Sequence, residues 1–98
     1  MNGYPVPEKR HWLVQAEFLD GTIIEGMSDE DVIVRWRRLA GWADPTAQSD
    51  PEQWLQRVLD RARVFYGAVL IGINEHSAPE HILNALAAEQ CLILRRRS

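Results

Sequence analysis

The residues of this chain whose types and spacing could do chemistry gather in one short segment, Asn74-Glu75-His76-Ser77. An apolar run precedes the segment and an amphipathic stretch follows it. We therefore expect it between a strand and a helix, where ligands of open α/β sheets commonly bind. Its phosphate signal is weak, because a lone glycine, Gly72, precedes it and Glu75 would repel an anion. A ligand or enzyme site at Asn74, Glu75, His76 and Ser77 is retained as an alternative to a simple turn and helix cap.

Metal binding and nucleophilic catalysis find no further support in the residue spacing. His76 and His81 are separated by five positions, whereas two zinc ligands on one helical face lie about three or four apart. Cys91, the lone cysteine, begins an apolar stretch and is expected to be a small buried side chain. We predict no catalytic residue, no metal and no cofactor.

Arginine makes up nearly all of the positive charge, with one lysine, Lys9, among 11 basic residues. An arginine-rich face would favour nucleic-acid binding, but the net charge of −3 argues against binding through bulk positive charge. Several arginines also have acidic neighbours at helical spacing, such as Asp31 and Arg35. Nucleic-acid binding is therefore the second hypothesis, and its candidate residues are Arg35, Arg38, Arg57, Arg61, Arg95, Arg96 and Arg97.

The four tryptophans favour a protein-binding function. Trp36 and Trp54 fall on the apolar stripes of predicted helices and are expected in the core. Trp42 instead follows a helix-stopping glycine in the longest predicted loop, and tryptophan is enriched among residues that carry binding energy at interfaces. If Trp42 is exposed, it forms a protein-binding patch with Arg38 and Pro45. The alternative is that Trp42 folds back over the helices as a lid.

A second partner-binding surface is predicted on the hairpin near the N-terminus. Residues 12–19 alternate apolar and polar side chains, which is typical of a half-buried strand, and Asp20-Gly21 closes the hairpin. A three-residue loop, with Gly21 left-handed, opposes Ala16 to Ile24 and keeps both on the buried face. Leu13 and Ile23 then lie on the outer face, where a second copy or another protein would cover them.

Three helix starts position these candidate sites. Ser28 with Asp31, Asp50 with Gln53, and Ser77 with Glu80 each pair an N-cap with a residue three positions later. They predict helices over 29–40, 51–66 and 78–90, the second of which buries an apolar stripe that ends at Phe65. Residues 68–73 and 91–94 are predicted strands. Because a helix connects them, they are expected to be parallel in a right-handed crossover.

The predicted fold is a two-layer α+β sandwich in the order β-β-α-α-β-α-β. Its mixed four-stranded sheet joins an antiparallel hairpin to a β-α-β unit, with helices mainly on one face. The 98 residues suit one globular domain, with an extended arm over 1–10 and a basic tail over 95–98. No apolar run reaches the roughly 20 residues of a membrane span. With a lone cysteine, this predicts a cytoplasmic protein.

We expect a small non-catalytic domain that binds another protein and acts as a regulator, inhibitor or immunity-type factor. Homodimerisation through the hairpin is possible on this interpretation, and binding to a membrane is not expected. The residues assigned to partner binding are Trp42, Arg38, Pro45, Leu13 and Ile23.

Overall fold

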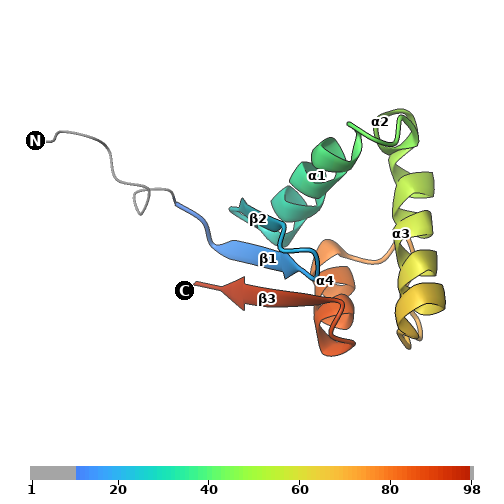
Figure 1. The fold of residues 1–98 in the computed structure, drawn as a ribbon. Coiled ribbons are helices and arrows are strands. Elements are labelled where there is room, and N and C mark those ends of the chain that lie inside the picture. The colour runs from blue at the N-terminus through green and yellow to red at the C-terminus, as the bar shows by residue number, and fades with distance from the viewer. Residues whose placement is uncertain (1–10, 98) are drawn as a thin grey trace, which may run out of the picture.

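The computed structural model describes residues 11–97, which form an α+β fold with a three-stranded antiparallel sheet and four helices (Figure 1). The strand order in the sheet is β2-β1-β3. The predicted arm over 1–10, and Ser98 of the predicted tail, lie outside the described residues. In chain order the elements are β1 (Val14–Phe18), β2 (Ile23–Gly26), α1 (Asp29–Ala40), α2 (Thr46–Ser49), α3 (Pro51–Tyr66), α4 (Pro79–Ala88) and β3 (Leu92–Arg96).

The hairpin of β1 and β2 has the predicted register. Ala16 lies opposite Ile24, and Gly21 has a φ of +91°, which favours glycine at this loop position. The Phe18 N–H donates to Thr22 O at 2.8 Å and closes the three-residue loop. The register places Ala16 and Ile24 on the buried face and Ile23 on the exposed one.

The first two predicted N-caps are confirmed and the third is wrong. Ser28 Oγ accepts from the Asp31 N–H at the start of α1, and Asp50 Oδ1 accepts from the Gln53 N–H at the start of α3. Helix α4 instead begins at Pro79. The residue before a proline favours extended backbone, and Ala78 accordingly has φ −60° and ψ 142° and is the N-cap. The Ser77 hydroxyl accepts from the Asn74 N–H within the preceding turn.

The predicted strand over residues 68–73 does not form, so the four-stranded mixed sheet is wrong. The segment alternates like a strand, with Ala68 and Leu70 buried and Val69 and Ile71 exposed. Its backbone is held by side chains instead of a neighbouring strand. The Val69 N–H donates to Glu89 Oε1 at 2.6 Å, and Arg63 Nη2 donates to the carbonyl oxygens of Leu70 and Ile73 at 3.3 and 2.7 Å.

The final strand, β3, pairs antiparallel with β1, so the predicted parallel crossover is also wrong. A tight turn after α4 reverses the chain: Gln90 adopts a φ of +62°, and the Cys91 N–H donates to Leu86 O. Because β3 extends to Arg96, two arginines assigned to a basic tail belong to the sheet. Arg95 lies opposite Gln15, and Arg96 opposite Val14.

The core lies between one face of the sheet and the helices. Figure 1 shows α1 and α4 beside the sheet and α3 on the far side of these two helices. The prediction that Trp54 is buried is confirmed, with 4% of it exposed. The prediction that Phe65 is buried is wrong, because 74% of this residue is exposed. Leu39 is half exposed. The largest fully buried side chains are Leu59, Ile82, Leu83, Leu86 and Val32.

Candidate functional site: two grooves beside α1

Trp42 projects into solvent from the turn that ends α1. The turn is held by successive backbone hydrogen bonds, in which the N–H groups of Ala43 and Asp44 both donate to Ala40 O, at 3.0 and 2.9 Å. The indole does not fold back as a lid, because 91% of Trp42 is exposed. The local backbone thus fixes where this side chain stands.

Trp42 stands at a groove of about 580 Å³ between the edge strand β2 and the exposed side of α1. We call it the Trp42 groove. Half-exposed apolar side chains from β2, the turn after it and α1 line it, together with two arginines of α1. The lining residues are His11, Ile23, Ile24, Glu25, Gly26, Met27, Arg35, Arg38, Leu39 and Trp42.

Two guanidinium groups, those of Arg35 and Arg38, and the carboxylate of Glu25 supply the charge in the Trp42 groove. Arg35 Nε lies 3.2 Å from Asp31 Oδ1, with both side chains partly in solvent. Among residues 11–97, no carboxylate lies within ion-pair distance of Arg38. Glu25 accepts a hydrogen bond from Gln15 Nε2 at 2.8 Å. The groove therefore presents apolar surface flanked by guanidinium groups.

The structure brings together three of the five residues assigned to partner binding. Trp42, Arg38 and Ile23 share the Trp42 groove. Pro45 is the N-cap of α2 and does not line this groove, although it belongs to the same loop as Trp42. Leu13 precedes β1 and is partly exposed. Met27 and Leu39 were not among the candidates, because their place in the groove depends on β2 lying beside α1.

The arginines assigned to nucleic-acid binding are distributed over different faces, and most contact other side chains. Arg57 binds Asp44 and Thr46. Arg95 binds Glu17 on the sheet at 3.0 Å, and the guanidinium of Arg97 stacks over the Trp12 ring at 3.6 Å. The remaining positions are Arg35 and Arg38 in the Trp42 groove, Arg61 on α3, and Arg96, which pairs with Asp29.

The segment over 74–77 is largely occupied by its own hydrogen bonds. Asn74 Oδ1 accepts from the His76 N–H at 2.7 Å, and Ser77 Oγ accepts from the Asn74 N–H at 3.0 Å. His76 Nε2 lies 3.8 Å from a carboxylate oxygen of Glu52 and 4.0 Å from one of Glu75. Within residues 11–97, no cluster of three or more histidine, cysteine or acidic side chains could hold a metal ion.

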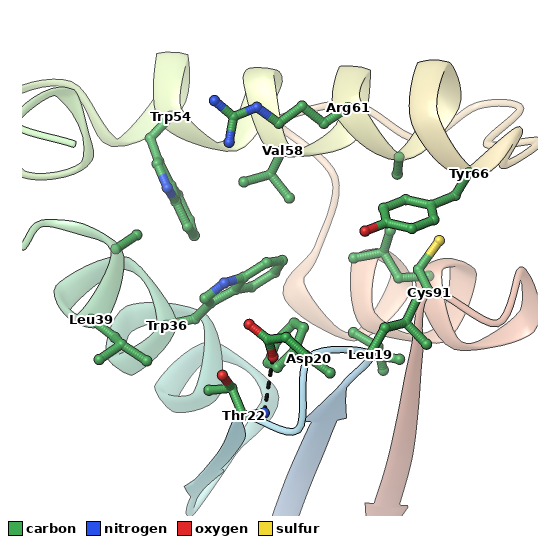
Figure 2. Close-up of a pocket in the computed structure, with 15 residues that line it drawn as sticks. Leu19, Asp20, Thr22, Trp36, Leu39, Trp54, Val58, Arg61, Tyr66 and Cys91 are labelled. Carbon is green, nitrogen blue, oxygen red and sulfur yellow. Dashed lines mark hydrogen bonds between the residues drawn. The ribbon is translucent and has the colours of Figure 1, made fainter. Parts of the chain in front are cut away.

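A second groove, of about 400 Å³, lies between α1 and α3 (Figure 2). We call it the α1–α3 groove. Its walls are mostly apolar and aromatic, with Trp36 on one side and Trp54 and Val58 on the other. Leu19 and Asp20 of the hairpin loop, together with Thr22 beside it, lie on the side of the groove away from α3. Its lining residues are Phe18, Leu19, Asp20, Thr22, Trp36, Leu39, Ala40, Trp54, Val58, Arg61, Ala62, Tyr66, Leu86, Cys91 and Leu92.

Two titratable groups in the α1–α3 groove have shifted pKa values. The pKa of the Asp20 carboxyl is lowered, chiefly because the Thr22 N–H donates to Oδ1 at 2.9 Å. The pKa of the Cys91 thiol is raised, chiefly by burial and also by the nearby negative charge of Glu89. Cys91 is therefore a protonated thiol at neutral pH and a poor nucleophile.

The chain shows no significant match to any protein-family model, curated protein or solved structure. In the part of the chain that the structure describes, no helix combines the length and apolar character that crossing a bilayer requires.

Proposed function

We propose that this chain is a small, non-catalytic protein-binding domain that acts as a regulator, inhibitor or immunity-type factor by occupying a partner's surface. The observation that carries the proposal is Trp42, which is 91% exposed at the edge of an open groove. An indole buries a large area on binding at low conformational cost, and interface hot spots are enriched in tryptophan and arginine. We expect the domain to act in the cytoplasm, because its lone cysteine suits a reducing compartment.

The charge of the Trp42 groove indicates the chemistry of the partner. Arg35 and Arg38 flank the apolar lining that Ile23, Met27 and Leu39 provide. A complementary segment would place an apolar side chain against Trp42 and a carboxylate near Arg38, where a guanidinium can bind it in a bidentate manner. We therefore propose that the partner presents an acidic surface with an apolar anchor.

Capture of partners from native lysate tests this function when wild-type protein is compared with matched variants. Trp42→Ala removes the exposed indole, and Arg38→Glu reverses a charge in the groove. Val64→Ala is the control, because Val64 is 75% exposed on α3 and lies outside the groove. Each capture is run with and without nuclease, and circular dichroism verifies that each variant is folded.

The proposal predicts a stoichiometric protein that survives nuclease, is lost with Trp42→Ala and Arg38→Glu, and is retained with Val64→Ala. Binding to that protein should weaken with added salt, since the groove recognises an acidic surface. Capture that disappears with nuclease would instead support the arginine-dependent nucleic-acid hypothesis. Capture that the Trp42 and Arg38 substitutions leave unchanged would contradict the proposed site.

A further inference from the structure

We propose that a second copy of this chain covers the α1–α3 groove, and that each copy inserts the C-terminal end of its α3 into the groove of the other. The inserted surface, which we call the overhang, consists of Phe65, Tyr66, Val69 and Ile71, all of them exposed. It belongs to the last turn of α3 and the loop after it. This interface is distinct from the hairpin face predicted from the sequence, and it shares only Leu39 with the lining of the Trp42 groove.

The overhang exists because the apolar stripe of α3 is longer than the surface that covers it. Phe65 follows Trp54 by eleven positions, about three helical turns, so both side chains point to the same side of α3. Yet Trp54 is buried and Phe65 is 74% exposed. The helix therefore continues a core-facing stripe beyond the end of the core.

The loop after α3 adds two apolar side chains in a fixed position. Val69 and Ile71 point outward while Ala68 and Leu70 point inward, and Ile71 is 88% exposed. Arg63 and Glu89 hold the loop backbone through the hydrogen bonds described above. Because the loop is held in place, less conformational entropy is lost when these side chains are buried at an interface.

The groove and the overhang are continuous at Tyr66. Tyr66 lines the α1–α3 groove and also belongs to the overhang, and Figure 2 shows its ring beside Cys91 at one end of the groove. A twofold axis beside Tyr66 would place the overhang of each copy opposite the groove of the other. An isologous contact needs such a self-complementary surface, here an apolar projection next to an apolar recess.

The charges at the α1–α3 groove favour a second copy of the chain over a partner whose surface carries charge of a single sign. Asp20 from the hairpin loop and Arg61 from α3 lie on opposite walls (Figure 2). Around a twofold axis, Arg61 of each copy would face Asp20 of the other. The lining of the Trp42 groove, by contrast, has Arg38 without a carboxylate at ion-pair distance among residues 11–97, and we propose that it fits a different, acidic partner. Opposite charges on one surface are compatible with an isologous contact, because a twofold axis can bring the positive group of each copy to the negative group of the other.

The dissociation constant for self-association, measured by analytical ultracentrifugation of the full chain, tests the proposal. We expect a concentration-dependent dimer in the micromolar range, and a dissociation constant raised by at least about tenfold in Phe65→Glu and Ile71→Glu. Val64→Glu is the matched control. Val64 is as exposed as Phe65, but it is offset from the buried Ala62 by about 200° and points away from the groove side. Unchanged thermal unfolding of dilute protein verifies that each variant is folded.

A charge-reversal pair tests the arrangement about the axis. Arg61→Glu alone should weaken the dimer, and Asp20→Arg combined with Arg61→Glu should restore it, since the opposite charges still face each other. Trp42→Ala should leave the dissociation constant unchanged, so failure of this proposal is distinguishable from failure of the proposed function. A monomer throughout the concentration range, or equal weakening by Val64→Glu and Phe65→Glu, would overturn the proposal.

Discussion

The indole rings of Trp36 and Trp54 meet edge to face, with centroids 5.2 Å apart and planes at 83°. Trp36 also packs against Phe18 of β1, at a centroid distance of 4.6 Å. The three rings thus connect the sheet, α1 and α3 in series. Trp36 and Trp54 also form facing walls of the α1–α3 groove. The same two rings therefore pack α3 against α1 and line the groove between these helices.

Replacing Trp54 by alanine should lower the free energy of unfolding by about 3 to 5 kcal/mol, because it removes a buried aromatic side chain and the contact with Trp36. Chemical denaturation monitored by circular dichroism measures the loss. Trp42→Ala is the control, since its exposed indole should change stability by less than about 0.5 kcal/mol. A loss below about 1 kcal/mol in Trp54→Ala would show that α3 is held to the body by other contacts.

The corner between β2 and α1 depends on one carboxylate. Asp31 Oδ2 accepts from the Met27 N–H at 2.9 Å, and Asp31 Oδ1 lies 3.2 Å from Arg35 Nε. These contacts, the Met27 hydrogen bond first, lower the pKa of Asp31. A Cβ on Gly26 would lie 2.8 Å from Asp31 Oδ2 and would displace the carboxylate.

Asp31→Ala should lower the free energy of unfolding by about 1 kcal/mol at neutral pH, because it removes the hydrogen bond from the Met27 N–H. Because the pKa of Asp31 is lower in the folded state than in the unfolded state, its contribution is present above the unfolded value and is lost as pH falls through the folded value. The difference between wild type and Asp31→Ala should therefore shrink below about pH 4. Urea denaturation at several pH values measures it, and a difference that grows with acidity would contradict the assignment.

Gly26→Ala should destabilise the same corner, because the new methyl group competes with Asp31 for space. If both substitutions act on one hydrogen bond, the double variant Gly26→Ala with Asp31→Ala should lose less stability than the sum of the two. Strict additivity within about 0.3 kcal/mol would show that Gly26 acts independently of the Asp31 carboxylate.

Arg63 fixes the loop over 68–73, and its replacement should release that loop. Nη2 donates to two carbonyl oxygens, while Nη1 lies 3.2 Å from Asp60 Oδ1. Arg63→Ala should cost about 1 kcal/mol, since the side chain is partly in solvent. Limited proteolysis should then cut near Ile71 faster than in wild type. Arg63→Lys should have an intermediate effect, because an ammonium keeps the charge without the planar fork, and equal cleavage rates in all three proteins would contradict this role.

Strands β1 and β2 and helices α1 and α3 were predictable because their signals are local, whereas the short helix α2 lies in a segment that was predicted to be a loop. The register of Ala16 with Ile24 follows from loop length and burial, and the helix starts at Ser28 and Asp50 follow from cap chemistry. The same reasoning placed Trp42 after the end of α1, and the structure shows its side chain exposed. The Trp42 groove itself was only partly predictable, because it requires β2 and α1 to lie side by side.

In the C-terminal part of the fold, helix α4 and strand β3 lie near their predicted positions, but the conformation of residues 68–73 and the antiparallel pairing of β3 were not predictable from local patterns. The apolar run over 68–73 has the composition of a strand, but its backbone does not pair with another strand. The Val69 N–H donates to Glu89, and the carbonyl oxygens of Leu70 and Ile73 accept from Arg63. These hydrogen bonds depend on where α3 and α4 pack. Phe65 satisfies the helical periodicity, yet periodicity cannot show that the core ends before the helix does. Both errors fall on the overhang, whose apolar side chains satisfy a sequence pattern without being buried in one copy of the fold.

The thiol of Cys91 should react slowly with iodoacetamide. Burial beside α4, together with the negative charge of Glu89, raises its pKa, and the thiolate is the reactive form. At neutral pH the folded protein should therefore be alkylated at least several-fold more slowly than the urea-unfolded chain, and its rate should keep rising with pH after the rate of the unfolded chain has levelled off above about pH 8.5. Mass spectrometry of timed samples measures both rates. Equal rates in the folded and unfolded protein at neutral pH would show that neither burial nor Glu89 protects this sulfur.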